Sequence, residues 1–97
     1  MEVIVHPKVD DDLVDHIAYY SREGGSELGI EFYSEFLRCY YIIVERAASF
    51  PLYTPRLRRI NFNRFPYHIL FEVLEDEVIH VVVVKHDSRD PDFGLDR

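Results

Sequence analysis

The stretch of sequence that decides the fold is FPYHILFEVLEDEVIHVVVVKHDSRDP, residues 65–91. Its two apolar arms, Tyr67–Leu74 and Val78–Lys85, flank the acidic turn Glu75–Asp76–Glu77, and this pattern predicts a tight β-hairpin. The second arm contains the run Val81–Val84, which no polar residue interrupts. A strand with one exposed face alternates apolar and polar residues, so an uninterrupted run predicts a central strand that is covered on both faces.

A polar cluster, Lys85–His86–Asp87–Ser88–Arg89–Asp90, follows the second arm directly. Side chains that lie just beyond the end of a buried strand project into solvent from a rigid support. We therefore expect a functional site, if the protein has one, at this strand end.

The composition is that of a single folded domain, spanning residues 1–97. With 47% hydrophobic and 14% aromatic residues, the chain has the material for a compact core. Its one cysteine, Cys39, excludes an internal disulfide and a thiolate metal cluster, and it lies in an apolar helical pattern that predicts burial. No H-x-x-x-H or C-x-x-C spacing is present, so the sequence indicates no metal site and no cofactor.

The hydropathy pattern argues against a membrane location. No apolar run approaches the roughly 18–20 residues that cross a bilayer. The N-terminal segment MEVIVHPKVDDD has no basic leader and turns acidic at once, which is not the pattern of a signal peptide. We therefore predict a cytoplasmic protein without a membrane segment.

The charges are distributed unevenly along the chain. The net charge is −7, from 11 basic and 18 acidic residues, which argues against non-specific affinity for nucleic acid. From Glu2 to Glu45 there are ten acidic and three basic residues, whereas residues 46–71 contain five arginines and no acid. This basic middle segment either meets an acidic or phosphate-bearing partner or forms a solvated strand edge.

Two helices and two further strands are predicted before the hairpin. The β-branched run Glu2–Val5 indicates a strand, and a helix with proline at its first position is expected over residues 7–21. Ser26 is the expected N-cap of a second helix over residues 27–49. Arg56–Phe62 indicates the strand that precedes the hairpin.

Together these elements predict an α+β fold of two layers. The order β-α-α-β-β-β places a helical hairpin on a small, mainly antiparallel four-stranded sheet. The wide aromatic stripe of the second helix is expected to be core, with the alternative that part of it forms a groove for a partner helix. Leu57 is out of phase with Ile60 and Phe62, which indicates a bulge or a late start of that strand.

Two motifs at this element order carry a resemblance to a known family. Phe65-Pro66-Tyr67-His68 opens a strand, and His86-x-x-Arg89-Asp90-Pro91-x-Phe93 closes the last one, with a final Arg97. Over essentially the whole chain, the sequence resembles the RelE/ParE toxin superfamily of bacterial type II toxin–antitoxin modules. It is most similar to the ParE, or plasmid stabilisation, branch.

The resemblance implies one of two activities. RelE-like members cut mRNA in the ribosomal A site, which requires a base, cations for the phosphorane charge and an acid. At the positions where the resemblance leads us to expect two arginines and a tyrosine, this chain has His68, Asp87 and Phe93. A ribosome binder should also be basic, and this chain is not. These departures favour the ParE-like activity, the poisoning of DNA gyrase, over an enzymatic one.

A different ribonuclease activity is the alternative. His68 and His86 are candidate catalytic residues, because histidine titrates near neutral pH and the ends of two hairpin arms lie side by side. A third possibility is a degenerate member that binds its antitoxin but is not toxic.

The resemblance also implies partners. A cognate antitoxin is expected to wrap the toxin, to place a helix in an apolar groove, to add a strand to a sheet edge and to carry any operator DNA binding of the complex. The toxin alone is expected to bind no specific DNA sequence. Arg89 and Arg97 have an alternative structural role, in which they pair with Asp87, Asp90 or Asp96. The candidate target-binding residues are Arg56, Arg58, Arg59, Arg64, Lys85, His86, Arg89 and Arg97.

Overall fold

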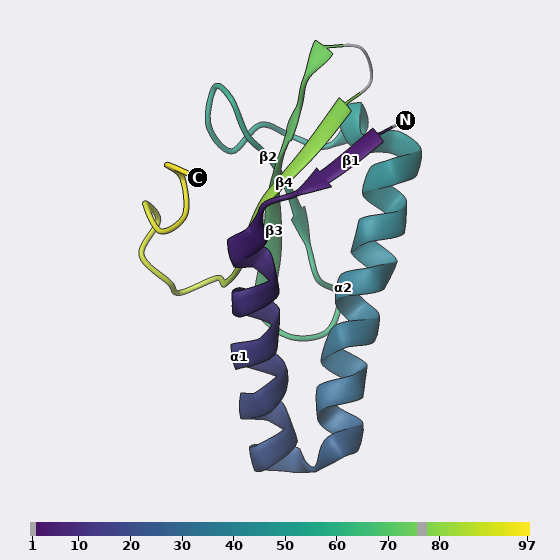
Figure 1. Ribbon diagram of the computed structural model, residues 1–97, viewed down its shortest axis with the longest axis vertical. Coiled ribbons are helices and arrows are strands. Elements are labelled where there is room, and N and C mark those ends of the chain that lie inside the picture. The colour runs from purple at the N-terminus through teal and green to yellow at the C-terminus, as the bar shows by residue number, and fades with distance from the viewer. Residues whose placement is uncertain (1, 76–77) are drawn as a thin grey trace.

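The computed structural model, shown in Figure 1, describes residues 2–75 and 78–97; Asp76 and Glu77 of the expected turn lie outside the described residues. The predicted β-α-α-β-β-β order is confirmed, with one short 3-10 helix added. The elements are β1 (Glu2–Val5), α1 (Pro7–Gly24), α2 (Ser26–Arg46), η1 (Ala47–Ser49), β2 (Arg58–Asn61), β3 (Tyr67–Val73) and β4 (Val78–His86).

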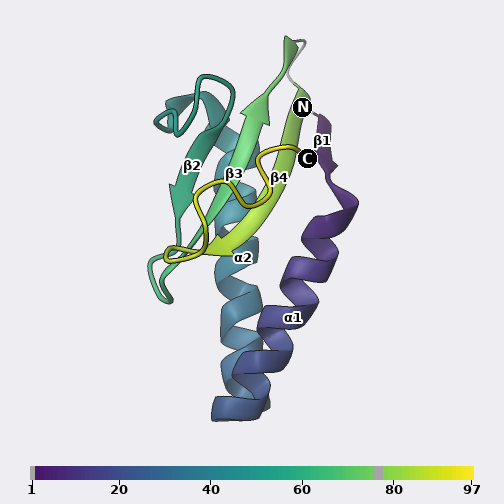
Figure 2. The same ribbon diagram turned by 90° about the vertical axis from the view of Figure 1, so that its left-hand side faces the viewer.

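The four strands form one mixed sheet in the order β1-β4-β3-β2. β4 is central, as predicted: it pairs in parallel with β1 and antiparallel with β3, and β3 pairs antiparallel with β2. Figure 2 shows that α2 lies behind the sheet, whereas the C-terminal tail, residues 87–97, crosses the other face. We call these the helix face and the tail face.

A β-bulge explains the uninterrupted valine run. Leu70 pairs with Val83 but Phe71 pairs with Val81, so Val82 is the extra residue in β4. As a result Val81 and Val84 join the core on the helix face, while Val82 and Val83 pack on the tail face with Leu57, Leu70, Tyr53, Phe93 and Leu95. The prediction of a central strand covered on both faces is therefore confirmed.

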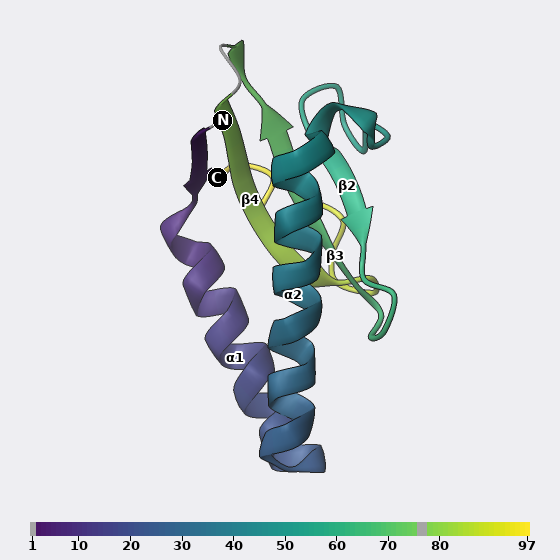
Figure 3. The same ribbon diagram turned by 90° about the vertical axis from the view of Figure 1, so that its right-hand side faces the viewer.

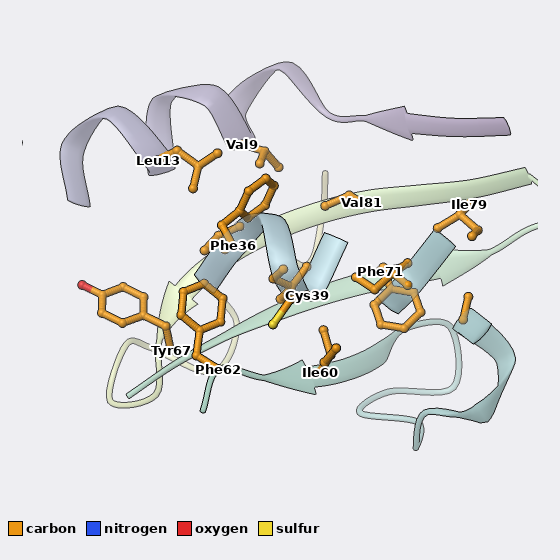
Figure 4. Packing of buried hydrophobic residues seen from close by; sticks show 14 of the residues in the cluster. Val9, Leu13, Phe36, Cys39, Ile60, Phe62, Tyr67, Phe71, Ile79 and Val81 are labelled. Carbon is orange, nitrogen blue, oxygen red and sulfur yellow. The ribbon is translucent and has the colours of Figure 1, made fainter. Parts of the chain in front are cut away.

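The main core lies between the helices and the sheet, as Figure 4 shows. Val9 and Leu13 of α1 and Phe36 and Cys39 of α2 pack over buried strand residues such as Phe71. Burying each large apolar side chain contributes about 1.5–3 kcal/mol, so this layer supplies most of the folding energy. Burial also raises the pKa of the Cys39 thiol to about 11, which keeps it protonated.

The helix boundaries differ from the prediction by a few residues. α1 continues to Gly24, past the expected end at Ser21, because only Gly25 breaks the helical hairpin; its φ is 85° and its N–H donates to the Ser21 carbonyl. Ser26 is the first residue of α2, not its N-cap. α2 ends at Arg46, and the last three residues of the predicted helix form η1.

β2 starts late, which was one of the two expectations for Arg56–Phe62. The strand begins at Arg58, and Leu57 before it turns to the tail face. The bulge in this sheet lies between β3 and β4 instead. Within the described part of the chain, neither helix is long and apolar enough to cross a membrane.

Candidate functional site

The predicted strand-end site lies on the tail face, where three strands place polar residues side by side. Asn61 pairs with His68, and His68 pairs with Lys85. Residues paired across strands point to the same face, and Leu70, two residues after His68, belongs to the tail-face cluster. Arg59 is two residues from Asn61 and therefore shares this face; its Nε donates to Asn61 Oδ1 at 2.7 Å.

Asp87 contacts two of these groups. Its Oδ1 lies 2.8 Å from His68 Nδ1 and 3.4 Å from an Arg59 guanidinium nitrogen. We call Arg59, His68 and Asp87 the Asp87 cluster. The cation and the imidazole that a phosphate-cleaving site would need are here held by an internal carboxylate.

His68 is the most enclosed member of the cluster, with only 2% of its surface exposed. Because an ionised carboxylate only accepts hydrogen bonds, His68 Nδ1 carries the proton and donates to Asp87, and Nε2 is the unprotonated nitrogen. Nε2 is buried and has no hydrogen-bond partner among the residues that the structure describes. Burial lowers the pKa of His68, against the opposing effect of Asp87, so the ring is neutral at neutral pH.

Lys85 is buried beneath the tail, with 1% of its surface exposed. Its ammonium donates to the carbonyls of Asp90, Pro91 and Phe93 at 3.3, 2.9 and 3.1 Å. Burial lowers its pKa. Lys85 therefore binds the tail to the sheet, and its ammonium does not face a partner.

Arg97 is buried as well, at the end of the tail. Its guanidinium donates to both carboxylate oxygens of Asp12, at 2.7 and 3.0 Å, and to the carbonyl of Val82 at 3.1 Å. Asp12 also accepts from the backbone N–H of Val84 at 3.2 Å. The expected tail pairing of Arg97 is therefore corrected: its partner is Asp12 of α1 and not an aspartate of the tail.

His86 and His68 point to opposite faces of the sheet. His86 pairs with Tyr67, whose ring lies in the helix-face core, while the neighbouring His68 pairs with Lys85 on the tail face. The His86 ring contacts Tyr67 at a centroid distance of 5.1 Å, and its Nδ1 accepts from the Ser88 N–H at 3.0 Å. The geometry thus does not bring the two candidate catalytic histidines together.

Arg89 does not pair with a tail aspartate. Its guanidinium lies over the Phe93 ring, with Cζ 4.0 Å from the ring centroid. Within residues 2–75 and 78–97, no carboxylate forms an ion pair with it. Asp87 is engaged in its own cluster, and the Asp90 carboxylate accepts from the Asp92 N–H.

The arginines of the basic segment do not form one patch. Arg56, like Arg59, makes its contacts on the tail face. It pairs with Glu72 at 3.3 Å and donates to the Leu95 carbonyl. Arg58 donates to the Phe50 carbonyl at 2.6 Å, near the end of α2. Arg64 pairs with Glu31 on α2.

An apolar groove lies between the two helices. The helices diverge toward the sheet, as Figure 3 shows. The volume of the groove is about 430 Å³, and Val14 and Tyr33 on its walls are 64% and 43% exposed. Part of the aromatic stripe of α2 thus forms a groove, the alternative left open by the sequence. The lining residues are Val5, Asp10, Leu13, Val14, Ile17, Tyr33, Phe36, Leu37 and Tyr40.

Asp12 and His16 are functional candidates that sequence reasoning missed. Both lie on the same helical face as Val9 and Leu13, and this position of two polar residues within an apolar stripe was the available signal. His16 lies 3.1 Å from the hydroxyl of Tyr67, and burial lowers its pKa. No group of three or more His, Cys, Asp or Glu among the described residues has the geometry to hold a metal ion.

Comparisons with known proteins agree with this fold. The family model of the ParE toxin of type II toxin–antitoxin system, parDE, matches residues 3–91. A chain of the chromosomal ParDE toxin–antitoxin system from P. aeruginosa superposes with a TM-score of 0.77 at 17% identity, covering 89% of this chain and 95% of that one. The isolated E. coli RelE toxin superposes with a TM-score of 0.54 at 15% identity, covering 92% and 86%. No curated protein matches the sequence.

Proposed function

Because the chain belongs to the ParE toxin family of type II toxin–antitoxin systems, we propose that it arrests growth by binding and poisoning DNA gyrase, not by cutting RNA. The observation that carries this choice is the Asp87 cluster. An internal carboxylate holds Arg59 and His68, two groups that a phosphodiester-cleaving site would have to offer to its substrate.

The other groups at the strand end also argue against RNA cleavage. Cleavage by a ribose 2′-hydroxyl needs a base, an acid and cations near the phosphate. Lys85 is buried against carbonyls, and Phe93 has no hydroxyl to donate a proton. A protein that acts by docking needs none of these groups free.

We assign the docking role to Arg56 and Arg89, which are exposed on the tail side of the molecule, and to the half-buried His86 at the strand end. Arg59 is left out because Asp87 holds it. Arg58 and Arg64 contact Phe50 and Glu31 away from this surface, and Lys85 and Arg97 are left out because their side chains are buried. Exposed arginines attract an acidic or phosphate-bearing surface over about 10 Å at 0.1 M salt, so inhibition should weaken as ionic strength rises.

A cognate antitoxin is the second partner that we propose. The groove between α1 and α2 fits the apolar side of a helix, and the exposed acidic residues of α1, such as Asp10 at its wall, favour basic flanks on that helix. The antitoxin would also carry operator DNA binding of the complex, and both proteins would act in the cytoplasm.

The open edge of the sheet for an added strand is β1. At the other edge, β2, the Arg59 N–H already donates to the Pro51 carbonyl, and the Asn61 carbonyl accepts from the Cys39 thiol. β1 lies at the end of the strand order, and its last residue, Val5, lines the groove. One antitoxin segment can therefore fill the groove and continue as a strand beside β1.

Growth after induction of the chain in bacterial cells tests the proposed activity. Growth arrest with filamentation and DNA damage is the expected result. Rapid loss of protein synthesis without DNA damage would favour mRNA cleavage instead, and unimpaired growth without an antitoxin would indicate a non-toxic member.

The antitoxin site is tested by copurification with the product of a neighbouring small reading frame. Val14→Asp places a charge in the groove and should weaken the complex at least about 10-fold, the equivalent of about 1.4 kcal/mol. The matched control is Ile30→Asp, because Ile30 is also 64% exposed on a helix but does not line the groove. Equal binding by both variants would contradict this site.

A further inference from the structure

A small pocket of about 150 Å³ lies where β4 ends against α1 and the tail. Its walls include Asp15 and His16 of α1, His86 of β4, and Arg89 and Phe93 of the tail. Neither the sequence motifs nor the proposed docking of gyrase explains why two imidazoles and an arginine surround one small space.

Arg89 is the fixed cation of this pocket. Phe93 supports its guanidinium at 4.0 Å, and no described carboxylate pairs with it. A guanidinium carries five N–H donors in one plane. Stacking restricts its orientation and leaves those donors available to a ligand, a geometry that suits an oxyanion.

The two imidazoles have one nitrogen occupied each. His86 Nδ1 accepts from the Ser88 N–H, so the proton of the neutral ring lies on Nε2. His16 Nδ1 lies 3.1 Å from the Tyr67 hydroxyl and is occupied by this contact, so Nε2 is the ring nitrogen left for a ligand. Neither Nε2 atom has a hydrogen-bond partner within the described part of the chain.

Tyr67 contacts both imidazole rings. The centroid of its ring lies 4.7 Å from that of His16 and 5.1 Å from that of His86, with edge-on geometry in both contacts. The two imidazoles that line the pocket are therefore packed against one buried ring, and little side-chain ordering is needed when a ligand binds.

The other charges around the pocket are largely satisfied. Asp12 is neutralised by Arg97, and Lys85 donates to three tail carbonyls. The exposed Asp15 is the opposing charge, and no ion pair to it is found among the described residues. The remaining groups are donors, which favours an anion over a cation.

We infer that this pocket binds a phosphate group, held by the Arg89 guanidinium, by the Nε2–H of His86 and by Nε2 of His16. The three groups belong to three different elements, α1, β4 and the tail. The oxygens of a phosphate point in several directions and can contact all three, whereas the two oxygens of a carboxylate lie in one plane. The volume admits a phosphate group but not a base and a ribose. The source is either free phosphate or the terminal phosphate of a nucleotide.

This inference deepens the proposed function, because His86 and Arg89 belong to the proposed docking residues. Phosphate binding does not require gyrase, however. A pocket that binds no phosphate leaves gyrase inhibition to be tested by itself, and a chain without effect on gyrase can still bind phosphate.

Calorimetric titration of the full chain with inorganic phosphate, AMP and adenosine tests the pocket. Saturable binding of phosphate, of AMP or of both is expected, and adenosine should not bind. Binding of phosphate alone identifies the free ion as the ligand, and tighter binding of AMP identifies a nucleotide. Absence of binding by phosphate and AMP, or equal binding of AMP and adenosine, would overturn the inference.

Three variants test whether the phosphate binds in this pocket. Arg89→Gln should weaken phosphate binding by about 10-fold or more, because a charge-assisted pair is lost. Asp15→Asn should strengthen it, since a repelling charge is removed. Arg22→Gln, an exposed arginine near the far end of α1, is the matched control and should change nothing.

Proton NMR of His16 supplies a readout that does not depend on affinity. A bound phosphate stabilises the imidazolium, so phosphate should raise the pKa of His16 from its lowered value in the wild type. It should leave that pKa unchanged in Arg89→Gln. Equal responses of Arg89→Gln and Arg22→Gln in both measurements would place the phosphate elsewhere and reject the pocket.

Discussion

The two faces of the sheet are covered by different means. On the helix face, fully buried side chains such as Phe32 and Phe71 form a continuous apolar and aromatic core. On the tail face, the apolar cluster around Leu70 and Val83 is small, and polar contacts hold the cover in place. Lys85 is chief among them, with three carbonyls of the tail as acceptors.

The difference shows why cationic residues near a strand end need not serve a partner. A thin layer such as the tail has too little apolar surface to stay packed on the sheet by burial alone. Hydrogen bonds from buried cations therefore hold it in place. Lys85 and Arg97 are cations of this structural kind. Arg89 has no carboxylate partner among the described residues, and Arg56, although it pairs with Glu72, remains 42% exposed, so both are candidates for docking. Burial and partners, not charge in the sequence, separate structural cations from candidate docking residues.

The largest effect is expected from Asp12→Ala. The change leaves Arg97 buried without its carboxylate, and breaking a buried ion pair in this way costs about 3–5 kcal/mol. The free energy of unfolding in urea measures it. The control is Asp11→Ala, an exposed neighbour on α1 that should change stability by less than about 0.5 kcal/mol. Equal losses in the two variants would mean that polar contacts do not hold the tail.

Gly94→Ala should cost about 2–4 kcal/mol, through left-handed backbone strain and overpacking. Gly94 has a φ of +82°, and an added Cβ would lie 2.8 Å from Val83 Cγ2. Gly25→Ala is the comparison, because Gly25 has a similar φ of +85° but open space around its Cβ position. Urea unfolding of both variants should show the larger loss for Gly94, and the reverse order would contradict the close packing of the tail on β4.

Acid should destabilise the protein in part through His68. Burial lowers the pKa of His68 in the folded protein, so below its ordinary value of 6.5 the unfolded chain takes up the proton first. Stability therefore falls as pH drops from about 6.5 toward the folded pKa. His68→Gln should show a shallower decline over this window in urea unfolding at a series of pH values. An unchanged slope would mean that His68 is not buried as a neutral ring.

The smallest effect is expected from Arg56→Gln. Arg56 is 42% exposed in its ion pair with Glu72, and exposed pairs contribute about 0–1 kcal/mol. A loss of stability as large as that of Asp12→Ala would end the distinction between structural and docking cations. The same variant, tested for growth arrest, reports whether Arg56 contributes to target binding.

The element order and the central position of β4 were predictable because hydrophobic periodicity and the valine run record burial directly. The bulge at Val82 was not, since a run of valines fits either face in any register. The break between the helices was expected over several residues, but a single Gly25 in the left-handed region provides it.

The site was predictable only in position. The sequence indicated the strand end, but the partner of Arg97 is Asp12, 85 residues away, and such long-range pairs leave no local pattern. The same holds for the Asp87 cluster, which the pairing of β2, β3 and β4 brings together, and for His16 beside Tyr67, which the packing of α1 against the sheet brings together. Local sequence thus identified the charged residues, and tertiary contacts determined which of them remain available.

The most direct measurement is the supercoiling of relaxed plasmid by purified DNA gyrase in the presence of the purified protein. The account predicts loss of supercoiling with accumulation of broken DNA as the protein approaches saturation, and an RNA added to the same reaction should stay intact. Full supercoiling at saturating protein would contradict it.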